Sequence, residues 1–165
     1  MNGLHLLSNS VDQLAGPQEN ITHCLMFSLA DEEYAVDMLR VREVKVLDTV
    51  TTLPNTPDYI RGVFNFHGDI VPVIDLRLLL GADEQKQTSK SIALVLRLDS
   101  ANNRLVAALV DDVLEPLDIA DEDIKAVPDF NSKIDTSCIH GLVSINGKVK
   151  VILNVEQLLS REALG

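Results

Sequence analysis

An internal repeat constrains the fold of this chain more than any other feature of its sequence. Aligned without gaps at an offset of 79 positions, residues 59–81 match residues 138–160 at five of 23 positions. The identical pairs are Ile60 and Ile139, Gly62 and Gly141, Gly68 and Gly147, Leu79 and Leu158, and Leu80 and Leu159. Apolar segments share identities by chance, but here turn and cap positions match as well. The chain is therefore expected to contain two copies of one supersecondary unit.

Each copy reads as a strand, a tight turn, a second strand and a short helix. Asn146-Gly147 separates two short apolar runs, and this dipeptide favours a two-residue hairpin turn because both of its residues need a positive φ. His67-Gly68 occupies the same position in the first copy, and histidine is enriched among residues with positive φ. Asp75 and Asn154, which also align, can cap the helix that follows.

Outside the repeat, apolar residues alternate with a period of two, which is typical of strands. The alternating sets are Leu25, Phe27 and Leu29; Ile92, Leu94, Leu96 and Leu98; and Leu105, Ala107 and Leu109. Two short helices are predicted, one from Thr56 and Pro57 to a stop at Gly62 and one after Asp75. The chain is thus predicted to be all-β with a few short helices, forming two small subdomains that close into barrels to remove their sheet edges.

The folded domain is expected to span residues 21–161. Residues 1–20 show no sustained apolar period and are expected to form a flexible N-terminal tail, and residues 162–165 a C-terminal tail. Cys24 and Cys138 belong to no CxxC pair and follow no secretory signal, which predicts unbridged thiols in the cytoplasm. No run approaches the ~18 apolar residues of a membrane span.

Charge and motif content argue against several functions. A net charge of −11 would repel nucleic acid. The acidic run from Asp111 to Ile124 lacks the residue order of an EF-hand, and the neighbours His23 and Cys24 would face opposite ways in a strand rather than share zinc. No nucleophile, nucleotide-binding or zincin motif occurs. We therefore expect no catalytic residue, no metal and no cofactor.

Three segments resemble the successive signature blocks of CheW-type coupling proteins: Asp31–Val44, Leu53–Arg77 and Gly141–Leu159. The resemblance extends over roughly residues 21–161. It implies two five-stranded SH3-like barrels packed around a shared hydrophobic core, without enzymatic activity. It also implies an adaptor that couples the cytoplasmic tip of chemoreceptors to the regulatory domain of a CheA-type histidine kinase, without inserting into the membrane.

One position departs from the family pattern. The family usually carries Asn-Leu-Arg-Gly where this chain has Asn65-Phe66-His67-Gly68. This exchange replaces a permanent cation with an imidazole, whose ordinary pKa is about 6.5. A parallel chemosensory system, such as one controlling type IV pili, therefore stays open beside flagellar chemotaxis. A barrel that binds a small ligand between its halves is a second hypothesis, although few polar groups converge on such a site.

The resemblance assigns partner contact to one segment and one turn. The expected partner-binding residues are Met38, Val41, Glu43, Val44, Gly62 and His67. We expect Val41, Glu43 and His67 to lie close together on the exposed surface of the first subdomain. The alternative is that Met38, Val41 and Val44, at spacing i, i+3 and i+6, are ordinary core residues. Gly62 fits either a helix stop or a contact.

Overall fold

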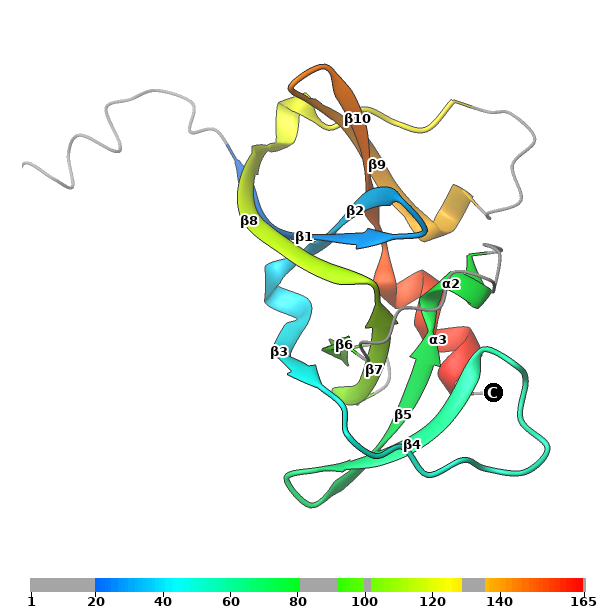
Figure 1. The fold of residues 1–165 in the computed structure, drawn as a ribbon. Helices are drawn as coiled ribbons and strands as arrows, with labels where there is room; N and C mark the ends of the chain where they lie inside the picture. Colours follow the sequence, from blue (N-terminus) through cyan, green and yellow to red (C-terminus); the bar gives the residue numbers. More distant parts are fainter. Residues whose placement is uncertain (1–19, 81–91, 100–101, 129–135, 165) are drawn as a thin grey trace, which may run out of the picture.

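The structure is a computed structural model that describes residues 20–80, 92–99, 102–128 and 136–164 (Figure 1). All but one residue of the expected N-terminal tail thus lie outside the described residues. The predicted all-β fold is confirmed: most of the described chain forms two five-stranded sheets. In chain order the elements are β1 (Ile21–Leu29), β2 (Glu32–Asp37), η1 (Met38–Arg40), β3 (Val41–Val46), β4 (Ile60–Phe66), β5 (Asp69–Asp75), α2 (Leu76–Leu79), β6 (Ile92–Leu98), β7 (Arg104–Val110), β8 (Asp112–Ala120), η3 (Asp121–Asp123), η4 (Thr136–Cys138), β9 (Ile139–Ile145), β10 (Lys148–Leu153) and α3 (Val155–Leu164).

The two copies of the internal repeat have the same order of secondary structure. β4, β5 and α2 form the first copy, and β9, β10 and α3 form the second. At the two turns, His67 has a φ of 52° and Asn146 a φ of 54°. The cap residues also match: Asp75 accepts a hydrogen bond from the Arg77 N–H at 3.0 Å, and Asn154 accepts one from the Gln157 N–H at 3.2 Å. α3 continues to Leu164, beyond the expected end of the domain at residue 161.

One sheet is built from five consecutive strands of the chain, and the other from strands of its two ends. The sheet with the order β3-β6-β7-β5-β4, here called the first barrel, contains the first repeat copy, and β8-β1-β2-β10-β9, the second barrel, contains the second copy. β3 follows β2 in sequence but pairs with β6, and β8 follows β7 but pairs with β1. The chain therefore passes between the barrels twice, and η1 is the first of these crossovers.

Each sheet closes through a short bridge beyond its regular strands. Thr51 and Val63 exchange backbone hydrogen bonds of 2.8 and 2.9 Å, and Lys125 and Leu142 exchange two of 2.8 Å. The bridges join the outer edges of β4 and β9 to the chain that follows β3 and β8. Closure pairs backbone groups that an open sheet would leave exposed.

The bridge between Thr51 and Val63, here called the barrel seam, closes the first barrel. Gly62 lies at this barrel seam, and its prediction as a helix stop was wrong. No helix forms after Thr56; the chain turns instead, and the Ile60 N–H donates to the Pro57 carbonyl at 3.0 Å. Gly62 lies inside β4 with a φ of 143°, and a Cβ there would lie 2.1 Å from the Thr51 carbonyl oxygen. Local turn chemistry suggested the helix, whereas the glycine is required by a contact with a distant strand.

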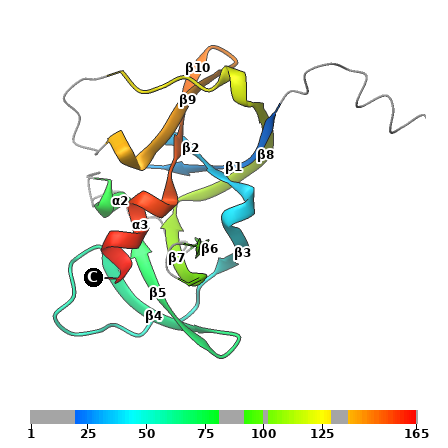
Figure 2. The same ribbon diagram turned by 180° about the vertical axis from the view of Figure 1, so that it is seen from behind.

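The hydrophobic core has three parts. The largest lies between the barrels and combines residues of both sheets with Leu158 and Leu159 of α3. A smaller cluster around Phe64 and Phe66 fills the first barrel, and another around Met26 fills the second. The shared core expected for the fold is therefore present, and α3 helps to join the two barrels (Figure 2).

Lys150 is an unusual residue in the core of the second barrel. It aligns with Val71 of the first repeat copy, which is almost fully buried in the first barrel. The Lys150 side chain is only 10% exposed, and its Nζ donates to Glu33 Oε1 at 2.5 Å. An ion pair thus stands where the other barrel has a valine. The Glu33 side chain is 43% exposed, so only the lysine end of the pair is buried. Burying such a charge often stabilises a fold no better than an apolar side chain of similar size.

We expect Lys150→Met to change the free energy of unfolding by between zero and a gain of about 2 kcal/mol, because methionine fills the same space without a charge to desolvate. Glu33→Ala should instead lose about 1–2 kcal/mol, since it leaves a buried ammonium group without its carboxylate. Urea unfolding of both variants is the measurement. A larger loss in Lys150→Met than in Glu33→Ala would contradict this account of the pair.

Candidate functional site

Apolar side chains gather on the outside of η1 and β3. Seven large hydrophobic residues are exposed among the described residues, and three of them fall within eight positions. These are Leu39, Val44 and Val46, which are 76%, 43% and 63% exposed. Val44 and Val46 lie two residues apart and so share one face of β3. We call these three residues, from η1 and β3, the β3 face; exposed apolar residues this near one another along the chain are candidates for an interaction surface.

Met38 and Val41 do not belong to this exposed surface, contrary to expectation. Both are half-buried and pack against the core between the barrels. Val41 pairs with Leu96, a residue of that core, and a register shift follows between Val41 and Glu43. Met38 and Val41 are thus partly buried against the core, whereas Val44 is exposed.

Glu43 and His67 do lie together at one end of the first barrel. Glu43 Oε1 and His67 Nε2 are 3.8 Å apart, and both side chains are exposed. The His67 ring stands edge-on to Phe66, with 4.3 Å between the ring centroids, which holds the imidazole at the β4–β5 turn. Of the expected trio, two members therefore meet at the surface while Val41 packs inward. Gly62 is buried at the barrel seam.

Sequence reasoning missed Leu39 and Val46 as surface residues. Val46 shares the exposed side of β3 with Val44, so the alternation of the strand carried the signal. Leu39 follows Asp37, whose carboxylate accepts a hydrogen bond from the Leu39 N–H at 3.0 Å and caps η1. A one-turn 3-10 helix has no apolar period of its own, so its outward residue could not be identified from a pattern.

A hollow of about 310 Å³ lies where β1, η1 and β10 meet, and it has mixed polar walls. Its carboxylates are already engaged, because Asp37 caps η1 and Asp121 accepts a hydrogen bond from the Thr22 hydroxyl at 2.6 Å. Across the described ranges, no group of three His, Cys, Asp or Glu side chains is placed to hold a metal ion. Within the same ranges, no helix has the length and apolar content needed to cross a membrane.

The two repeat hairpins project from opposite ends of the molecule. The β4–β5 turn and the β9–β10 turn lie at opposite extremes in both ribbon views (Figures 1 and 2). Ile70 and Val149 occupy equivalent positions beside these turns, and both are exposed. The molecule therefore presents two related ends as well as the β3 face, an arrangement that can contact more than one partner at a time.

Comparison with known proteins gives consistent matches along the chain. The family model for the CheW-like domain matches residues 23–163. The chain is 33% identical to the chemotaxis protein CheW of Klebsiella aerogenes over 164 residues, covering 99% of this chain and 94% of that protein. It is 32% identical to CheW of Helicobacter pylori over 144 residues, covering 87% and 85%. The scaffolding protein TtCheW from Thermoanaerobacter tengcongensis has a similar crystal structure, with a TM-score of 0.76 and 28% identity over 87% of this chain and 90% of that chain.

Proposed function

The chain belongs to the CheW-like domain family, and from this membership we propose that it is a non-catalytic adaptor coupling chemoreceptors to a CheA-type histidine kinase. The observation that carries the proposal is that the similarity to chemotaxis proteins runs along nearly the whole chain. A scaffold needs surfaces rather than a reaction centre. The exposed β3 face and the two hairpin ends are such surfaces.

We assign the chemoreceptor tip to the β3 face. Leu39, Val44 and Val46 offer apolar area that a helical partner can cover, and the Glu43–His67 pair adds polar groups beside it. An apolar centre with a polar rim is the usual organisation of a protein interface. Met38, Val41 and Gly62 then support this surface from beneath rather than touch the partner. The kinase regulatory domain is assigned to the β9–β10 end, away from the β3 face and from His67.

The remaining features fit an adaptor that works in the cytoplasm. The net charge of −11 disfavours nucleic acid as a partner. Cys24 is fully buried, and burial raises the pKa of its thiol to about 11, so that little reactive thiolate forms near neutral pH. We therefore assign the cysteine to the core and no chemistry to it.

The proposal is tested by measuring how this chain binds each partner alone and in the presence of the other partner. The chain is titrated by calorimetry with a receptor cytoplasmic-tip fragment, then with the kinase regulatory domain, and then with each in the presence of the other. An adaptor with two surfaces should bind both partners at once. Absence of binding to either partner, or strict competition between them, would contradict the proposed function.

A further inference from the structure

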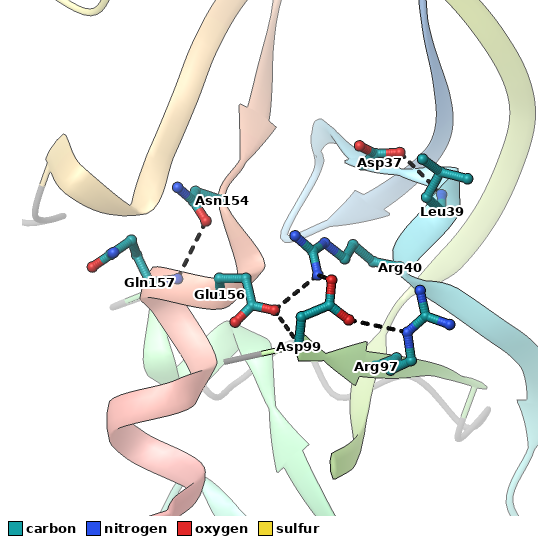
Figure 3. A network of polar contacts seen from close by, with 8 residues as sticks. All are labelled: Asp37, Leu39, Arg40, Arg97, Asp99, Asn154, Glu156 and Gln157. Atoms are coloured by element: carbon teal, nitrogen blue, oxygen red, sulfur yellow. Dashed lines mark hydrogen bonds and ion pairs between the residues drawn. The ribbon is translucent and has the colours of Figure 1, made fainter. Parts of the chain in front are cut away.

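We propose that Arg40 is a positioning residue that fixes η1, which carries Leu39 of the β3 face, relative to both barrels. The inference rests on the proposed function for its consequence, but its geometry is independent of it. Arg40 is the last residue of η1, directly before β3. It belongs to an ion-pair network, here called the clasp, which consists of Arg40, Arg97, Asp99 and Glu156 (Figure 3).

One guanidinium nitrogen of Arg40 contacts two carboxylates. Arg40 NH1 lies 2.6 Å from Asp99 Oδ2 and 2.9 Å from Glu156 Oε1. Glu156 Oε1 also accepts a hydrogen bond from the Asp99 N–H at 2.5 Å, and Arg97 Nε donates to Asp99 Oδ1 at 3.2 Å. As Figure 3 shows, residues of three separate chain segments meet in the clasp: η1, the end of β6 and α3.

Two of these three segments connect the barrels, and the third belongs to the first barrel. η1 carries the chain from β2 of the second barrel to β3 of the first, and Glu156 lies on α3, which follows β10 of the second barrel. Asp99 follows β6 of the first barrel. Arg40 and Glu156 are 116 positions apart in sequence. The clasp therefore joins a crossover of the chain to the helix that packs across the barrel junction.

Burial makes the Arg40–Glu156 pair the effective part of the clasp. Their side chains are 26% and 17% exposed, so solvent screens their attraction less than it screens the more exposed Arg97–Asp99 pair. Charge-assisted hydrogen bonds of this length are stronger than neutral ones.

Besides the clasp, the Asp37 cap and the partial packing of Met38 hold η1 in place. The helix has only three residues and none of them is fully buried. Met38 packs partly against the core, while Leu39 points outward. No member of the clasp belongs to the apolar clusters that fill the two barrels. Loss of the clasp should thus leave the fold intact and loosen η1, while β3 stays paired with β6. Leu39 would then lose its fixed orientation relative to Val44 and Val46.

The test compares Arg40→Met with Arg42→Met in the full chain. Methionine keeps an unbranched apolar stem but removes the ion pairs, and Arg42 is an exposed neighbour for which the described contacts include no ion pair. Amide hydrogen exchange of η1 is the first readout. We expect exchange at least tenfold faster in Arg40→Met than in the wild type, with no such change in Arg42→Met.

The second readout is functional. Arg40→Met should bind the kinase regulatory domain with unchanged affinity but reduce receptor-controlled kinase output at least tenfold relative to the wild type. Arg40→Lys, which keeps a cation, should restore most of the output. Unchanged exchange at η1 in Arg40→Met would overturn the inference, as would a collapse of melting temperature and of both binding reactions together. If the wild type binds neither partner, the proposed function fails, while the exchange experiment still tests the clasp.

Discussion

Gly62→Ala is expected to lower the free energy of unfolding by about 3–4 kcal/mol, because two penalties coincide at this position. The added Cβ would lie 2.1 Å from the Thr51 carbonyl oxygen, a backbone atom that cannot rotate away. The φ of 143° is also one that residues with side chains rarely adopt. Relief requires Thr51 to move, which breaks its two hydrogen bonds to Val63 at the barrel seam. Urea unfolding measures the loss.

Gly68→Ala is the matched control, because it isolates the conformational penalty. Gly68 also has a positive φ, of 94°, but a Cβ there meets nothing within 4 Å. We expect a loss of about 1 kcal/mol from this variant. Equal losses in the two variants would mean that Gly62 is needed only for its backbone conformation and that the seam does not require a close approach.

Val41→Asp is expected to lose stability, whereas Val44→Asp is expected to lose binding of the receptor. Val41 packs against the core between the barrels, so an aspartate there places a charge against apolar side chains and should cost about 3 kcal/mol of stability. Val44 is exposed, so Val44→Asp should unfold within about 0.5 kcal/mol of the wild type. It should nevertheless weaken binding of a receptor tip fragment by about 1–3 kcal/mol, because it puts a charge into the apolar centre of the proposed contact.

Circular dichroism melting and calorimetric titration of both variants separate these effects. The assignment of the β3 face fails if Val44→Asp binds the receptor fragment as tightly as the wild type does. The assignment of Val41 to the core fails if Val41→Asp melts like the wild type and loses binding alone, which was the expectation from sequence.

The architecture was predictable from sequence wherever local chemistry specifies it. The turns at His67 and Asn146 and the caps at Asp75 and Asn154 are short-range features, and each appears where the repeat predicted it. The pairing of β3 with β6 and of β8 with β1 was not predictable in this way. A strand reveals which of its faces is apolar, but its choice of partner depends on which other edge is available in the folded chain.

The candidate site was only partly predictable for the same reason. Glu43 and His67 meet as the family resemblance implied, since a strand start and a hairpin turn converge at one end of the first barrel. Val41 is half-buried because it packs against the core between the barrels, a long-range contact that spacing along β3 does not reveal. The clasp was not foreseen, because its members are far apart in sequence and charged residues on a surface have no periodic signature.

Reconstituted kinase output tests the central claim most directly. Receptor cytoplasmic fragments and a CheA-type kinase are held at fixed concentrations, and autophosphorylation is measured while this chain is titrated in. An adaptor that links the two should raise kinase output to a maximum and then lower it in excess, when separate copies occupy receptor and kinase. The maximum should be lost with Val44→Asp. Kinase output that stays constant across the whole range of ratios would contradict the account.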